Sequence, residues 1–189
     1  MTETFIPSER VMVLFQEMAA AADIGPVPDR ERADLLETLR THRTFLRHTL
    51  RGLSEEQARQ RPTVSALSVG GLLTHVTAME AQWADFILRG PEAMSGGQDA
   101  FASGFEMASD DTVEGVLARY AEVAQRTDEL VRSLPDLDVT QPLPPAPWFR
   151  PGEQRSVRRV LLHLVAETSQ HAGHADILRE SLDGAKTMG

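Results

Sequence analysis

One predicted helix carries three ionisable side chains in the middle of its apolar stripe. In residues 156–182, the positions that alternate by four and three are Val160, Leu164, Glu167, His171, His174, Leu178 and Leu182. A stripe with this spacing normally faces the core of a helical protein. A lone carboxylate and two imidazoles would lose much hydration free energy there unless they shared a partner. A divalent cation is the simplest such partner, so the pattern predicts a metal site.

Glu167 and His171 are the first two candidate metal ligands. Four residues apart, they differ by about 40° around a helix and stack one turn apart, which presents both side chains to one ion. Helix bundles hold metals by pairs of this kind. The spacing alone is a weak signal, because a solvated surface pair explains most such matches. The aliphatic residues on either side strengthen the metal interpretation.

Two further histidines of this helix have open roles. His174 follows His171 by three residues on the same stripe. It is a candidate ligand, a hydrogen-bond partner of a ligand or a general base, and a core histidine bonded to a carbonyl is an equally good interpretation. His163 lies one turn before Glu167 and is more typical of the boundary of a buried face than of a ligand.

A metal held by one helix would be poorly fixed, so a further ligand must come from another helix. His75 is the best donor, because it belongs to a second apolar stripe, made with Leu72, Met79, Gln82 and Phe86. The alternative is a packed histidine beside Trp83. His42 on the preceding helix is a fourth possible ligand, and His48 is expected to be exposed.

Together, His75, Glu167 and His171 form a set of two imidazoles and one carboxylate. Three protein ligands leave a coordination position open, as catalytic zinc sites do and structural zinc sites do not. Zinc is the first expectation. Nickel, iron and manganese bind the same ligand types, so the set does not identify the metal.

Composition excludes several classes of function. The chain has 189 residues, a net charge of −9 and no cysteine. The acidic balance argues against nucleic-acid or anionic-membrane partners, which need a basic surface. Without cysteine there are no disulfides, thiolate ligands or thiol nucleophiles. Neither a signal peptide nor a membrane-spanning segment is visible, so a cytoplasmic protein is expected.

Helical periodicity dominates the chain, and no convincing strand alternation is found. Long helices are predicted at about 30–51, 69–89, 112–133 and from 156 to just before Gly184, with a short one at 8–22. Ser68 is expected to cap the second long helix, Asp29 the first, and Asp111 with Glu114 to form a capping box for the third.

Four long amphipathic helices predict an all-α four-helix bundle. We expect one such domain over residues 29–189, preceded by an extension, residues 1–28, that carries the short helix. The connections 91–109 and 134–155 are longer than usual bundle loops, and the second holds six prolines. They are expected either to cross the end of the bundle or to cover a site.

Two segments resemble the DinB/YfiT-like family of helical-bundle metalloproteins. The first is Ser68-Val-Gly-Gly-Leu-Leu-Thr-His75, and the second is Glu167-Thr-Ser-Gln-His171-Ala-Gly-His-Ala-Asp-Ile-Leu-Arg-Glu180. The family commonly has His-x-x-x-His in the last helix. A subgroup with Glu in the first place includes mycothiol-dependent maleylpyruvate isomerase and mycothiol S-transferase-like proteins, and this chain is similar to that subgroup from about residue 30 onward.

The resemblance implies metal ligands at His75, Glu167 and His171, an up-down-down-up bundle and, often, a homodimer. It also implies a low-molecular-weight thiol as cosubstrate. His174 stands where many relatives have Gln.

On this basis the sequence predicts a transferase in which a mycothiol-like thiol attacks an electrophilic small molecule as a metal-bound thiolate. His174 is the candidate acceptor of the thiol proton. Arg43 and Arg179 are candidates for holding a substrate carboxylate, although an ordinary surface ion pair is the alternative for both. Trp148 and Phe149 of the proline-rich connection would close the site, or else pin that connection to the bundle.

Three other functions remain open from the sequence. The same site suits a thiol-dependent isomerase, or a hydrolase that uses metal-bound hydroxide. The third alternative is non-catalytic, with the metal bracing the bundle of a stress-induced binding protein. An open coordination position favours chemistry, whereas a fourth protein ligand such as His174 favours a structural role.

Overall fold

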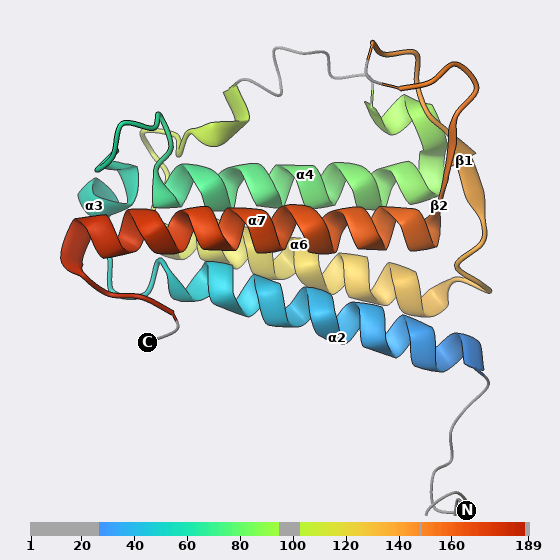
Figure 1. The fold of residues 1–189 in the computed structure, drawn as a ribbon, viewed down its shortest axis with the longest axis horizontal. Helices are drawn as coiled ribbons and strands as arrows, with labels where there is room; N and C mark the ends of the chain where they lie inside the picture. The colour runs from blue at the N-terminus through green and yellow to red at the C-terminus, as the bar shows by residue number, and fades with distance from the viewer. Residues whose placement is uncertain (1–26, 95–102, 148, 188–189) are drawn as a thin grey trace, which may run out of the picture.

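The structure is a computed structural model that describes residues 27–94, 103–147 and 149–187 (Figure 1). It contains four long helices, which confirms the predicted all-α class. The predicted helix at 8–22 lies outside the described residues. In the described part of the chain, no helix is both long and apolar enough to cross a bilayer.

The first two helices of the described chain are α2 (Val27–His48) and the short α3 (Glu55–Arg59). Because α2 begins at Val27, Asp29 lies inside its first turn and the predicted cap is wrong. Ser54 caps α3 in a complete capping box with Gln57. The chain then enters α4 (Val69–Arg89), where Ser68 accepts a hydrogen bond from the Gly71 amide and confirms the predicted N-cap.

The connection after α4 is partly ordered, with the 3₁₀ turns η1 (Gly90–Met94) and η2 (Ser103–Phe105). Helix α6 (Val113–Ser133) follows, and here the predicted capping box is wrong by one residue. Thr112 is the N-cap, and its hydroxyl accepts from the Gly115 amide. The Asp111 carboxylate instead accepts from the Ala108 amide and pairs with Arg119.

The proline-rich connection contains a short antiparallel pair, β1 (Thr140–Pro142) and β2 (Gln154–Ser156), which the sequence did not predict. The two strands are three residues long and form a two-stranded sheet within the described residues, so β1 is an edge strand, where proline is tolerated. Ser156 then caps α7 (Val157–Asp183), and Gly184 ends it in the left-handed conformation.

Contacts between helix ends give the direction of each helix. Arg158 at the start of α7 pairs with Glu31 near the start of α2, so these helices are parallel. The side chain of Gln141, in β1 beyond the end of α6, donates to the Ile87 carbonyl near the end of α4, which agrees with α4 and α6 running in the same direction. The colour gradient in Figure 1 shows the same order, α2 and α7 one way and α4 and α6 the other.

The core lies between these four helices. Helix α7 packs between α2 and α4, and α6 packs mainly on α4. Leucine dominates the core, and the largest fully buried side chains include Tyr120, Phe86, Leu39, Leu46, Leu72 and Leu164. Only α4 and α7 carry the predicted ligands, so their contact decides the geometry of the candidate site.

Candidate metal centre

The three predicted ligands lie together. His75 projects from α4, and Glu167 and His171 project from α7. One ligand atom from each lies within 4.8 Å of the other two. His75 and His171 are buried, with 6% and 8% of their surface exposed, and Glu167 is partly exposed. The convergence of two helices on one point is therefore confirmed.

The carboxylate of Glu167 lies between two imidazoles of its own helix. Its Oε2 is 3.5 Å from Nε2 of His171, and its Oε1 is 3.9 Å from Nδ1 of His163. Across the helix interface, the rings of His75 and His171 have centroids 5.0 Å apart and are nearly perpendicular. Successive turns of α7 thus direct two donors toward the single donor of α4.

Burial keeps both candidate imidazoles neutral. Burial and the neighbouring His171 lower the pKa of His75 to about 4. The pKa of His171 is also lowered, by burial, against the opposing effect of Glu167. A neutral imidazole offers the lone pair that a metal needs. Nδ1 of His171 is buried without a hydrogen-bond partner among the described residues.

These features fit a bound divalent cation. Two neutral nitrogens and one carboxylate are a common ligand set for zinc and for other first-row metals. The neighbouring anion, Glu167, provides charge that a cation would balance in a largely buried position.

Phe105 is a neighbour of the site that the sequence did not reveal. Its ring stacks on His75 with centroids 3.7 Å apart and planes inclined by 14°, and it also meets the edge of His171 at 5.8 Å. Close backbone approach makes this stack possible. A Cβ atom on Gly71 would lie 2.0 Å from the Phe105 carbonyl oxygen. The adjacent glycines Gly70 and Gly71, one turn before His75, were the available signal.

The other histidines fall into different environments. The ring of His174 is 5.6 Å from that of His171, and its buried Nδ1 has no hydrogen-bond partner in the described part of the chain. It is not a member of the ligand group. His163 packs edge-on against Trp83, with centroids 4.9 Å apart. His42 lies beside Phe45 on α2, and His48 is exposed as predicted.

Arg43 has carboxylate partners inside the protein. Arg43 is 4% exposed, and its side chain donates to both oxygens of Glu80, at 2.5 and 3.1 Å, and to Asp128 at 2.7 Å. Glu80 is fully buried, and burial raises the pKa of its carboxyl against the opposing effect of Arg43. These contacts explain the burial of Arg43 without a substrate.

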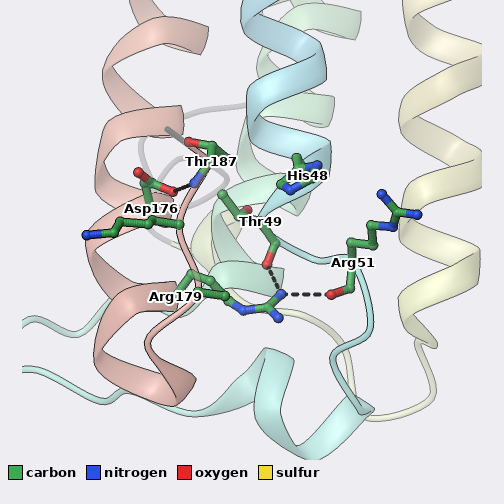
Figure 2. A pocket seen from close by; sticks show the side chains of 8 residues that line it. His48, Thr49, Arg51, Asp176, Arg179 and Thr187 are labelled. Carbon is green, nitrogen blue, oxygen red and sulfur yellow. Dashed lines mark hydrogen bonds between the residues drawn. The ribbon is translucent and has the colours of Figure 1, made fainter. Parts of the chain in front are cut away.

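Arg179 joins the ends of α7 and α2. Its Nη1 donates to the carbonyls of Thr49 and Arg51, at 2.8 and 2.9 Å, and the guanidinium pairs with Asp183. Figure 2 shows the two bonds to Thr49 and Arg51. Arg179 lines a small pocket of about 150 Å³ there. None of the three predicted ligands lines this pocket, whose other members include His48, Asp176 and Thr187.

Of the two aromatic residues predicted to close the site, Trp148 lies outside the described residues. Phe149 lies beside Arg155, whose guanidinium carbon is 5.3 Å from the Phe149 ring centroid and 4.8 Å from that of Trp83. No sequence pattern predicted a role for Arg155.

Comparison with known proteins identifies the family of the chain. A search of curated proteins finds no match. Among protein-family models, the one described as Mycothiol-S-transferase matches residues 34–184, which is most of the chain and includes all three predicted ligands. The match confirms the resemblance to mycothiol-related DinB-like proteins. The chain belongs to the mycothiol S-transferase family.

Proposed function

We propose that the protein is a metal-dependent transferase that activates a low-molecular-weight thiol, mycothiol or an analogue, for attack on an electrophilic small molecule. The observation that supports this most is the convergence of His75, Glu167 and His171 from two helices within 4.8 Å. The family match supplies the class of thiol.

His75, Glu167 and His171 would hold the cation, with zinc as the first expectation and nickel, iron or manganese as alternatives. A divalent cation bound there supplies Lewis acidity, which lowers the pKa of a thiol toward neutrality. The two imidazoles contribute no charge and Glu167 contributes one negative charge, so a divalent ion would keep a net positive charge. With three protein donors, one position remains for an exogenous group.

The surrounding side chains position the reactants and handle the proton. Phe105 covers one face of His75 and excludes water from that side. His174 is the proposed acceptor of the thiol proton, at the buried Nδ1 that has no other partner in the described chain. An imidazole nitrogen with a free lone pair can accept a proton and later release it.

Metal content after purification tests the site. Wild type should hold about one equivalent of divalent metal, and His75→Ala and Glu167→Ala should each lose most of it, since removing a ligand weakens a three-ligand site strongly. His48→Ala, at an exposed histidine, is the matched control and should retain the metal. Unchanged metal content in both ligand variants would rule out this ligand set.

Conjugation of a bimane electrophile tests the reaction. The rate should depend on added mycothiol and should fall to the uncatalysed level after treatment with a chelator. Hydrolysis that needs no thiol, or isomerisation with the thiol released unchanged, would instead identify the other predicted activities. A metal-loaded protein that turns over nothing with any thiol would support the non-catalytic alternative.

Several sequence predictions stay proposals. Arg43 and Arg179 are engaged by internal partners, and replacing each would show whether either also binds substrate. A cytoplasmic location and a homodimer are expected from the sequence and from the family resemblance respectively.

A further inference from the structure

Arg155 lies at the centre of β2. In the described part of the chain, no carboxylate forms an ion pair with its guanidinium. Its guanidinium lies over the ring of Trp83, 4.8 Å from the centroid, and 5.3 Å from the centroid of Phe149. Cation–π contacts of this kind hold the flat faces of the guanidinium against rings. The N–H donors at its edge are not engaged by these ring contacts.

Two of those donors are in an unfavourable environment. Nε and Nη1 of Arg155 are buried and have no hydrogen-bond partner among the described residues. An unsatisfied buried donor costs about 1–3 kcal/mol, and more when it is charged. Burial and the neighbouring Arg159 lower the pKa of Arg155, and Glu153 opposes them only in part. The side chain as a whole is partly exposed, so it is not sealed from solvent.

Arg158, three residues later, shows what a structural arginine looks like in this protein. It pairs with Glu31 through two nitrogens and with Asp138 through a third. Both residues emerge where β2 meets α7, yet only Arg158 has its donors satisfied. A purely structural role leaves the cost of burying the Arg155 donors unexplained.

A continuous row of contacts connects Arg155 to the predicted ligands. Arg155 lies over Trp83, the ring of Trp83 meets His163 at 4.9 Å, and His163 lies 3.9 Å from Glu167. His163 is one helical turn from Glu167, and Trp83 is two turns from His75. At a rise of 1.5 Å per residue, these separations are about 6 and 12 Å. The guanidinium lies over Trp83, so it is about 12 Å along α4 from His75. An elongated small molecule can span this distance.

We propose that Arg155 binds the carboxylate of an elongated small-molecule electrophile whose reactive end lies at His75, Glu167 and His171. A carboxylate fits the free edge of a guanidinium, where two N–H groups donate in parallel. The orientation of the substrate, with its reactive end at the metal centre, rests on the proposed transferase function. Anion binding at Arg155 itself does not depend on turnover.

Binding of an unreactive probe tests the anion site directly. Succinimidocaproic acid and its primary amide have the same length and differ in one charge. Metal-loaded wild type should bind the acid roughly tenfold more tightly than the amide, the usual effect of one charge-assisted pair. Titration calorimetry gives both affinities. Arg155→Met should abolish the preference, and Arg155→Lys should restore part of it.

Arg150→Met is the matched control, because Arg150 is an exposed arginine of the same connection. It should keep the preference for the acid. Thermal unfolding of Arg155→Met separates a ligand site from a structural cation–π contact. If the donors are unsatisfied in the free protein, the melting temperature should stay the same or rise. A clear fall, with the acid preference intact, would overturn the proposal.

Turnover then places the anion site relative to the reaction. Maleimidocaproic acid and its amide accept a thiol by addition, in which the S–C bond forms, the C=C π bond opens and the second carbon takes the proton. The acid should show a lower KM than the amide in wild type, and this difference should disappear in Arg155→Met. If wild type turns over neither compound but binds the succinimide acid through Arg155, the transferase proposal fails and the anion site stands. If it turns over both with equal KM, the anion site fails and the transferase stands.

Discussion

At the scale of single residues, the important property of His75 is that it is kept uncharged. Its pKa is lowered to about 4, by burial and by His171, while the same side chain in an unfolded chain titrates near 6.5. Between these values the unfolded protein binds more protons than the folded one. Stability therefore rises with pH in this window and is lost as pH falls through it.

We expect the metal-free protein to lose on the order of 1–2 kcal/mol of unfolding free energy through His75 between pH 7 and pH 5. His75→Gln removes the titrating group, so its stability should depend less on pH than that of wild type. Urea unfolding in the presence of a chelator, at both pH values, measures the difference. His48→Gln, at an exposed position, should behave like wild type. Parallel pH dependence in wild type and His75→Gln would contradict the assigned protonation state.

The ligand residues were predictable one by one because each interrupts an apolar stripe on its own helix. The spacing of these residues along each helix then gives the face of the helix on which their side chains lie, by helical geometry alone. Phe105 and Arg155 were not predictable in this way. Phe105 reaches His75 through a contact between segments thirty residues apart, and Arg155 is notable only for the partners it lacks. Neither feature has a local pattern.

At the scale of elements, the two glycines at the start of α4 allow another segment to lie directly on the helix. Gly71 meets the backbone of Phe105, and Gly70 meets the sulfur of Met107 and the carbonyl of Ala58. Backbone at this distance cannot move aside as a flexible side chain would. The helix therefore gives up favourable helix formers at two positions in order to hold Phe105 over His75.

Gly71→Ala should displace η2, because the new Cβ would lie 2.0 Å from the Phe105 carbonyl oxygen. We expect a loss of about 1–3 kcal/mol, typical of overpacking, together with weaker metal binding. Gly173→Ala is the matched control, since it is also in a helix and its Cβ would meet nothing within 4 Å. That change should stabilise the protein by roughly 0.5–1 kcal/mol. Chemical denaturation and metal titration of both variants measure the effects, and equal stabilisation by both would show that η2 does not pack as described.

Elements with a strong local signal were predicted well, and those with a weak one were not. Ser68 caps α4 as expected, because a serine directly before an apolar helix can accept a hydrogen bond from a free backbone N–H of the first turn. Before α6, Asp111 and Thr112 are both good caps. The Asp111 carboxylate forms an ion pair with Arg119 and accepts a hydrogen bond from the Ala108 amide. Thr112 is therefore the residue that caps the helix. The pair of β1 and β2 was missed because it spans a long proline-rich connection and has no alternating pattern.

At the scale of the whole molecule, three of the four long helices share one buried group of charges. Arg43 of α2 donates to Glu80 of α4 and to Asp128 of α6. Such a group contributes little net stability, because desolvation offsets the attraction between the charges. It does penalise any packing of the three helices that would separate the charges. We interpret it as a determinant of how α4, which carries His75, is aligned within the bundle.

Arg43→Met should therefore cost about 3–5 kcal/mol at neutral pH, because it leaves the fully buried Glu80 without its positively charged partner. Replacing both residues, in Arg43→Met with Glu80→Met, should recover most of that loss, since two apolar side chains then fill the space.

Burial raises the pKa of Glu80 against the effect of Arg43, so in the single variant the carboxyl takes up a proton as the pH falls. The cost of Arg43→Met should thus be smaller at pH 5 than at pH 8. Urea unfolding of wild type and of the single and double variants at both pH values gives the coupling free energy. A double variant that is as unstable as the two single changes added together would show that the charges act independently. In that case the alignment of α4 would have to come from the apolar contacts alone.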